Sequence, residues 1–194
     1  MKLSDCAELT AGVITGRVLE DRKNNTINPA NRIFVLSPRA IHDGEIDKSL
    51  LAEEYKKDDG REIPSKFLTE EGDIIIKLSS PYDSCLIGAE DEGLLIPSFC
   101  LKIRVTVSAV DRYFLLAFLN SKKCRDDLKS RCYGSVMAIV KKSDLEKVEL
   151  PFFTPVEQEE IGRRYRTVGE IRTVMERYLS LEQERIDVVF GGRE

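Results

Sequence analysis

The sequence has one histidine, His42, and its five cysteines include no C-x-x-C pair. A single histidine cannot complete a zinc cluster at finger spacing. It also leaves Ser-His-Asp catalysis unsupported, because His42 lies in the polar segment AIHDGE and no G-x-S-x-G motif occurs. The phosphate-binding patterns G-x-x-x-x-G-K-[ST] and G-x-G-x-x-G are missing too. The residues therefore form no convincing catalytic constellation, and this favours a binding role without a cofactor or metal.

Long apolar runs are also missing. No stretch approaches the roughly 20 apolar residues of a membrane span, and the N-terminal MKLSDCAELT lacks the apolar core of a signal peptide. With an odd number of cysteines, we expect a reduced, cytoplasmic protein with buried free thiols and no membrane partner. The 194 residues, 42% hydrophobic and 33% charged, favour one compact domain, or one domain with an appendage.

The net charge of -4 argues against a generic nucleic-acid binder, but the charges are unevenly distributed. Residues 41–100 carry six basic and fifteen acidic groups, whereas residues 101–147 carry eleven basic and five acidic groups. The basic segment could form a phosphate-binding face while the acidic one repels DNA. Equally, both could be ordinary solvated surface.

Apolar patterning predicts an α+β domain with a mixed or antiparallel sheet over residues 1–152. The clearest strand is DIIIKLSS, which is bounded by Gly72 and Pro81. IFVLSP predicts another strand, and residues 110–132 predict a helix with a thick apolar face followed by a second helical piece. A short helix is expected around Lys48–Tyr55.

The chain then turns sharply at LPFFTPVEQEEI and enters a long helix that we assign to residues 153–194. Thr154, Pro155 and Glu157 form the capping-box pattern, and no proline follows. About 35 helical residues span on the order of 50 Å, which overhangs a domain of this size. The helix carries a heptad-like stripe, interrupted by Glu182, that predicts a coiled coil with another copy or a partner helix. The alternative is that it packs back on its own domain. The stripe residues proposed for the dimer and partner contact are Ile161, Tyr165, Val168, Met175 and Leu179.

Several polar loops carry the residue types that contact bases and phosphates. These candidate DNA-binding residues are Arg17, Arg22, Lys23, Asn24 and Asn25 in the first loop, Lys77, Ser79, Ser80 and Tyr82 after the clearest strand, Lys122, Lys123 and Arg125 after the apolar helix, and Gly134 and Ser135 in a small loop.

Two other patterns have ordinary explanations. The acidic run Glu90–Glu92 could hold a cation but is more typical of an exposed hairpin tip. Asp127 and Lys129 match a nuclease D-x-K pair, but they lack a second acid on a neighbouring strand.

Four stretches of the chain, in order, are VLSPRAIHDGEIDKSLL, LTEEGDIIIKLSSP followed by LIPSFCLKIRV, YFLLAFLNSKKCRDDLKSRCYGSVMAIVKKSDLEKVELP, and LPFFTPVEQEEI. Together they resemble the specificity subunit of type I restriction-modification systems, the last one matching the I-P-x-P-x-x-x-E-Q-x-x-I junction into its spacer helix. The resemblance implies a non-catalytic target recognition domain on a spacer helix. In that family, two such domains, held apart by antiparallel helices, each read half of a split DNA site. Partner methyltransferase subunits flip and methylate adenine and connect to restriction subunits.

The chain departs from this pattern in three ways. It has one domain and one helix where the typical subunit has two of each, so it resembles a half-subunit that would act as a homodimer on a split, two-fold symmetric site. Val136 and Met137 follow the Gly-Ser where a polar residue is common, and Phe152 and Phe153 replace a proline-rich segment. The alternative function is a decoy that binds the methyltransferase without reading DNA, with the acidic 41–100 segment blocking productive complexes.

Overall fold

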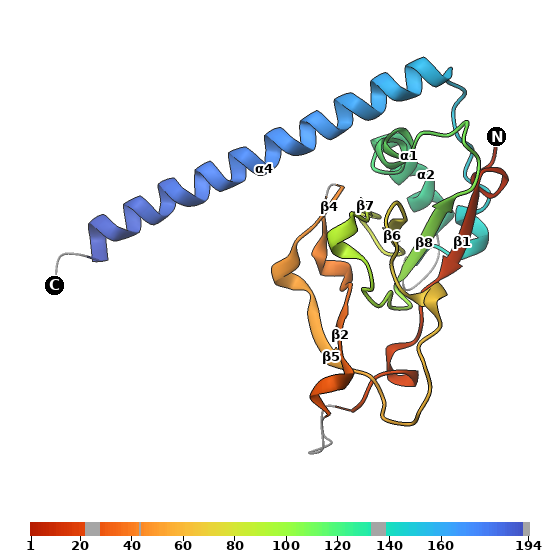
Figure 1. Ribbon diagram of the computed structural model, residues 1–194. Coiled ribbons are helices and arrows are strands. Elements are labelled where there is room, and N and C mark those ends of the chain that lie inside the picture. The colour runs from red at the N-terminus through yellow and green to blue at the C-terminus, as the bar shows by residue number, and fades with distance from the viewer. Residues whose placement is uncertain (22–27, 43, 133–138, 192–194) are drawn as a thin grey trace.

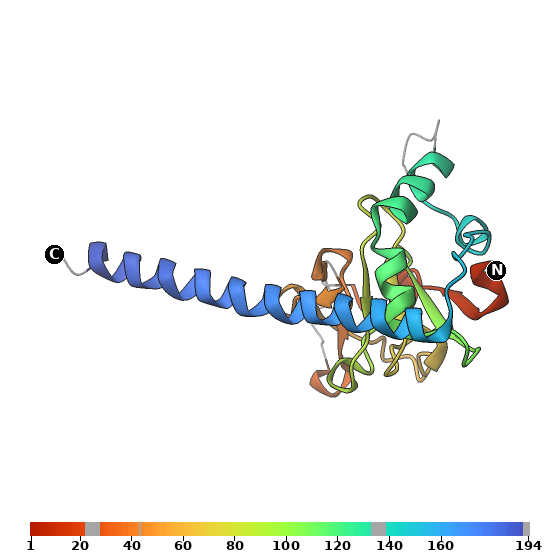
Figure 2. The same ribbon diagram turned by 90° about the horizontal axis from the view of Figure 1, so that it is seen from above.

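The computed structural model describes residues 1–21, 28–42, 44–132 and 139–191. It shows a folded domain from which one helix, α4 (Pro155–Gly191), extends as a rod well past the domain (Figures 1 and 2). Within the described ranges, no helix is long and apolar enough to cross a membrane.

The domain is built on a four-stranded antiparallel sheet. Its strand order is β1 (Ala7–Ala11), β8 (Cys100–Val105), β6 (Ile74–Lys77) and β7 (Ser84–Leu86). Two small antiparallel ribbons accompany it. They are formed by β2 (Arg32–Val35) with β5 (Ala52–Tyr55), and by β3 (Ile41–His42) with β4 (Glu45–Ile46). This confirms the predicted α+β class.

The strand predicted in DIIIKLSS is β6, Ile74–Lys77, and it is covered on both faces. Side chains alternate across a strand, so Ile74 and Ile76 enter the core cluster beneath α1 while Ile75 enters a second cluster on the other face. All three isoleucines are fully buried. Burial on both faces explains why the sequence shows a continuous apolar run there instead of alternation.

A third apolar cluster lies under the β2–β5 ribbon and includes Val13, Val35 and Leu95. The helix expected around Lys48–Tyr55 was wrong. Asp47 accepts a hydrogen bond from the Ser49 amide and closes a single 3-10 turn at Lys48–Leu50. The chain then becomes β5, because pairing with β2 satisfies its backbone. The other 3-10 turns are Leu3–Asp5, Thr15–Arg17, Pro29–Asn31, Pro38–Ala40, Ser65–Phe67 and Ala89–Asp91.

The predicted helical pair is present as α1 (Arg112–Leu119) and α2 (Lys122–Arg131), and a short α3 (Lys142–Leu145) follows. Side-chain oxygens cap both helices of the pair. Asp111 accepts from the Phe114 amide at 2.8 Å, and Ser121 accepts from the Cys124 amide at 3.2 Å. Such caps satisfy amides that have no partner inside the helix. The apolar face of α1 packs on the sheet.

Helix α4 begins with the predicted capping box. The Thr154 amide donates to the Glu157 carboxylate at 2.7 Å, and the Glu157 amide donates to Thr154 Oγ1 at 3.4 Å. The first half of α4 packs across α1, where Gly162 is buried against Asp111 and Tyr113. The second half projects away from the domain (Figure 2). The first half of the helix therefore packs back on its own domain, as the alternative reading predicted, and the coiled coil stays a prediction for the second half.

Candidate nucleic-acid interface

The end of β6 is joined to α2 by buried ion pairs. Lys77 Nζ lies 2.7 Å from one oxygen of Asp83, and Arg125 Nη2 lies 2.7 Å from the other. The Lys77 and Asp83 side chains are less than a tenth exposed. A buried carboxylate requires such partners, because its desolvation otherwise costs several kcal/mol. Lys77, predicted to enter a DNA groove, instead lies inside the domain and holds Asp83.

Asn120 connects the β6–β7 turn and α2 to α4. Its side chain accepts from the Ser84 amide at 2.9 Å, and its Nδ2 donates to the Ser84 carbonyl at 2.9 Å and to the Tyr165 hydroxyl at 2.8 Å. Arg125 also donates to Asn120 at 3.2 Å. The turn after β6, the start of α2 and the docked part of α4 therefore share one hydrogen-bonded network.

The turn between β6 and β7 presents few side chains to solvent. Ser80 precedes a cis peptide bond to Pro81 and is exposed, and Ser79 is half-buried. Tyr82 has a positive φ of 64° and is 1% exposed, and this burial raises its pKa to about 12. Of the residues predicted to read bases here, Ser79 and Ser80 reach the surface, whereas Tyr82 belongs to the core.

The first turn of α2 presents the predicted phosphate contacts. Lys122 and Lys123 are exposed, and the Lys122 side chain is 93% exposed even though it lies 3.6 Å from Asp126. Arg125 is different, because it points to Asp83 and its side chain is only 26% exposed. Lys122 and Lys123 can therefore reach a phosphate backbone, while Arg125 stabilises the helix position.

The first predicted loop lies elsewhere in the domain. Arg17 is exposed in a 3-10 turn whose Gly16 carbonyl accepts a hydrogen bond from Lys57, just after β5. Figure 1 shows the β2–β5 ribbon at the opposite end of the domain from α2. Arg17 and the α2 lysines therefore belong to separate surfaces. The other loop candidates fall outside the described residues, and they are Arg22, Lys23, Asn24, Asn25, Gly134 and Ser135.

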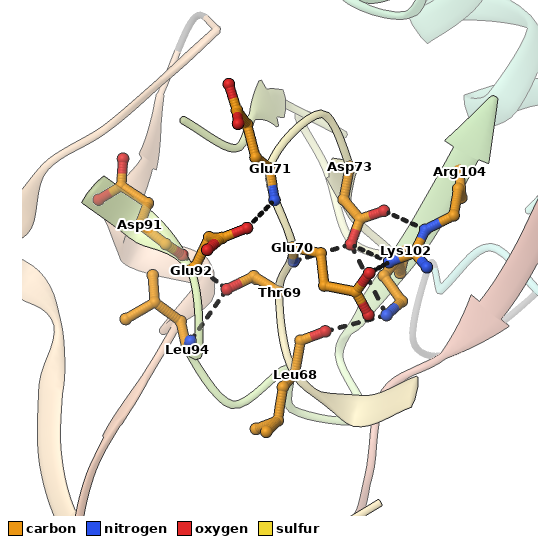
Figure 3. Close-up of polar contacts among 10 residues, drawn as sticks. All are labelled: Leu68, Thr69, Glu70, Glu71, Asp73, Asp91, Glu92, Leu94, Lys102 and Arg104. Atoms are coloured by element: carbon orange, nitrogen blue, oxygen red, sulfur yellow. Dashed lines mark hydrogen bonds and ion pairs between the residues drawn. The ribbon is translucent and has the colours of Figure 1, made fainter. Parts of the chain in front are cut away.

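A second buried network lies at the start of β6, and no local pattern in the sequence indicates it (Figure 3). Asp73 is 1% exposed and accepts two hydrogen bonds from Arg104, at 2.7 and 2.9 Å. Lys102 lies 3.6 Å from Asp73 and donates to the Leu68 carbonyl at 2.9 Å. Hydrogen bonds to Asp73 and Glu70 raise the pKa of Arg104. Asp73 thereby fixes the G-D turn to β8.

The described residues hold no group of three metal-ligating side chains. Asp127 is paired with Arg131 at 2.9 Å within α2, and Asp91 is largely buried and paired with Lys48 at 3.2 Å. All five cysteines are free and buried. Burial raises the pKa of Cys100 and of Cys124 to about 12, so these thiols stay protonated at neutral pH.

The predicted stripe on α4 divides between two faces. Tyr165 packs against the core cluster of its own domain, and Ile161 is half-buried. Val168, Met175 and Leu179 are each more than half exposed, at 53%, 53% and 62%. Exposed Ile171 and Tyr178 belong to the same surface, although the predicted contact set omitted them.

No family model matches the sequence, and no curated protein matches it either. Solved structures do. The HsdS subunit from Thermoanaerobacter tengcongensis matches all of this chain and 45% of its own chain, with a TM-score of 0.58 and 17% identity. The type I restriction-modification S subunit from M. genitalium matches all of this chain and 46% of its own, with a TM-score of 0.60 and 16% identity.

The chain has the fold of a type I restriction-modification S subunit. A structure from work on complex assembly and conformational transition of the type I R-M system agrees, with a TM-score of 0.58 and 13% identity over 97% of this chain. The match includes the folded domain and the rod together. The chain spans less than half the length of these S-subunit-like structures, 42% to 46%.

Proposed function

We propose that the chain recognises double-stranded DNA as the specificity subunit of a type I restriction-modification complex. The observation that carries this proposal is the S-subunit-like fold, which extends over the domain and the helix in one continuous match. The chain itself would be non-catalytic. Methylation of a flipped adenine would be performed by a partner methyltransferase subunit, and cleavage by a restriction subunit bound through it.

In this proposal, residues 1–152 form the recognition domain. Lys122 and Lys123 contact phosphates, and Ser79 and Ser80 approach the bases from the turn beside them. Arg17 contributes from the separate surface at the β2–β5 end. Residues of the first loop and of the Gly134–Ser135 loop remain predicted contacts. The five buried free thiols favour a reducing compartment, which we take to be the cytoplasm.

Residues 153–194 form the spacer in this proposal, and two copies of the chain pair through it. Support comes from the bare half of α4, Val174 to Phe190, where large apolar side chains such as Tyr178, Leu179 and Phe190 are 57%, 62% and 74% exposed. Apolar surface of this extent along one helix marks an interaction site. A homodimer reads a split site whose two halves are related by symmetry.

The test is a selection from random DNA duplexes with the full chain, with and without its methyltransferase, at two salt concentrations. Enrichment of a split, two-fold symmetric motif at both salt concentrations supports the proposal. Salt-sensitive binding with no motif, or no binding even with the methyltransferase, contradicts it. That result would favour a decoy that occupies the methyltransferase without reading DNA.

A paired set of variants separates phosphate contacts from general charge. The double variant K122A/K123A should weaken binding to all sequences alike and reduce the slope of log affinity against log salt by about two. K66A removes an exposed lysine from the 3-10 turn Ser65–Phe67 and should leave the slope unchanged. Equal effects of the two changes would exclude α2 as the phosphate contact.

A further inference from the structure

A second pair of exposed lysines lies close to the proposed phosphate contacts. Lys141 is the N-cap of α3 and Lys142 is its first residue, and both are exposed. Neither is among the DNA-binding residues predicted from the sequence. We call them the α3 lysines, and we call Lys122 and Lys123 the α2 lysines. The fold decides whether the two pairs can contact one ligand.

Backbone pairing places the α3 lysines beside the β6–β7 turn. The Val140 amide donates to the Leu78 carbonyl at 2.8 Å, and Ile139 forms an antiparallel bridge with Ser79. Lys141 is the next residue along the chain. Its position is therefore set by hydrogen bonds to the same turn that carries the two serines of the proposed base contact.

The two lysine pairs lie on opposite sides of the end of β6. Backbone hydrogen bonds of successive residues in a strand point to opposite sides. The Lys77 amide donates to the Asp83 carbonyl at 2.9 Å, on the side of β7. The next residue, Leu78, points toward β8 and accepts from Val140 there. Because Asp83 is paired with Arg125 of α2 at 2.7 Å, the α2 lysines lie on the β7 side of the turn and the α3 lysines begin on the β8 side.

Helix α2 sets the separation of the two pairs. The α2 lysines occupy its first turn, whereas Arg131, its last residue, donates to the Asp144 carbonyl of α3 at 3.5 Å. The 10 residues of α2 span about 15 Å, and the major groove of B-DNA is about 12 Å wide. Figure 2 shows α2 at the margin of the domain, clear of the rod. The two pairs are therefore spaced to reach phosphates on opposite strands of one major groove.

Acidic neighbours on the same helices leave these lysines able to bind phosphate. Lys122 lies 3.6 Å from Asp126, and Lys142 lies 3.6 Å from Glu146. The side chains of the second pair are 47% and 39% exposed. Exposed ion pairs one helical turn apart are weak and are screened by salt. A DNA phosphate can therefore replace the carboxylate at either lysine.

We propose that the α3 lysines contact the phosphates of one DNA strand and the α2 lysines those of the other, with the turn of Ser79 and Ser80 in the major groove between them. This inference rests on the proposed DNA-recognition function and adds contact residues to its site. Contacts on both sides of the turn fix it across the groove, because a shift toward one strand loses the contacts to the other. The serine hydroxyls, which both donate and accept, then face the base edges.

The salt dependence of DNA binding counts the contacts, measured on the full chain with its methyltransferase present. K141A/K142A should reduce the slope of log affinity against log salt by about two, and its combination with K122A/K123A by about four. K147A is the matched control. Lys147 is exposed in the same segment, but the next residue, Val148, accepts from the Leu3 amide at 2.8 Å, before the start of β1. The slope of K147A should equal that of the wild type, and all variants should unfold at the wild-type urea concentration.

Neutral phosphates test which strand each pair contacts. In duplexes that carry the selected motif, a single methylphosphonate should weaken wild-type binding wherever a lysine contacts the replaced phosphate. Within one half-site, the positions that no longer matter in K141A/K142A should lie on the strand opposite those that no longer matter in K122A/K123A. An unchanged slope in K141A/K142A, or positions on the same strand for both variants, overturns this inference and leaves the recognition function standing. A wild-type chain that selects no motif overturns both.

Discussion

From Gln158 to Thr173, α4 lies against its own domain, whereas from Val174 to Phe190 the described residues leave it uncovered. The docked half is held by close approach and directed hydrogen bonds: Gln158 donates to the Ala109 and Phe153 carbonyls and accepts from the Asp111 amide. The bare half offers aliphatic and aromatic side chains instead. Close approach at Gly162 and the buried Gln158 side chain hold the first half at a fixed angle to the domain, whereas the apolar side chains of the second half are left exposed.

The strongest contrast concerns the two glycines of the docked half. A Cβ at Gly162 would lie 2.9 Å from Tyr113 Cβ and 3.1 Å from the Phe114 amide nitrogen. A Cβ at Gly169 would meet only the end of the flexible Glu45 side chain, at 3.1 Å. G162V should therefore lose about 3 kcal/mol more unfolding free energy than G169V. Urea denaturation at one protein concentration measures the difference, and equal losses would mean that α4 does not dock at Gly162.

A smaller loss of unfolding free energy is expected at Gln158, whose side-chain amide is buried. Q158L leaves the Asp111 amide and two carbonyls without partners, which should cost about 2 kcal/mol. Q183L makes the same change in the bare half, where the Gln183 side chain donates to exposed Asp187. It should alter the unfolding free energy by less than about 0.5 kcal/mol. If the two variants unfold at the same urea concentration, Gln158 does not hold the joint.

The cap of α4 adds a pH-dependent contribution. Hydrogen bonds from the Thr154 amide and hydroxyl lower the pKa of Glu157 from its ordinary value. A carboxylate with a lowered folded-state pKa stabilises the fold above its unfolded pKa, and this is lost as pH falls through the folded value. E157Q should therefore be less stable than wild type at neutral pH, and the gap should close below about pH 4. With T154A present, the gap should shrink at every pH, as followed by thermal unfolding.

The smallest effect is expected at Val188, which is 74% exposed in the bare half. V188S should change the unfolding free energy by no more than about 0.5 kcal/mol. Comparison with G162V by the same urea denaturation completes the series. A loss near that of G162V would show that the end of the rod is covered in solution.

The sequence predicted the elements whose signals are local. The three isoleucines of β6, the capping box at Thr154 and the apolar face of α1 each depend on neighbours within a few residues. The short helix at Lys48–Tyr55 failed because pairing with β2, a contact between distant segments, overrode local preference. The sequence also did not predict that α4 divides into a docked half and an exposed half, because both halves share one heptad pattern.

The candidate site was harder to predict than the fold. A lysine after a strand is usually solvated, and only the structure reveals that Lys77 is buried against Asp83 and that Arg125, distant in the sequence, completes the pair. The same holds for Asp73, whose partners Lys102 and Arg104 lie on β8. Lys122 and Lys123, at the start of α2, are exposed, and their role as phosphate contacts stays a prediction.

The separation of the two faces of α4 has a consequence for exchange between related chains. The apolar side chains of the outer face, Val168, Ile171, Met175 and Tyr178, are each at least 53% exposed and are not held by the folded domain. A different domain could therefore be attached to the same rod while this apolar face remained intact. In the proposed homodimer, two chains that differ only in their domains would pair as readily as two copies of one, and the two halves of the proposed site would then be unlike.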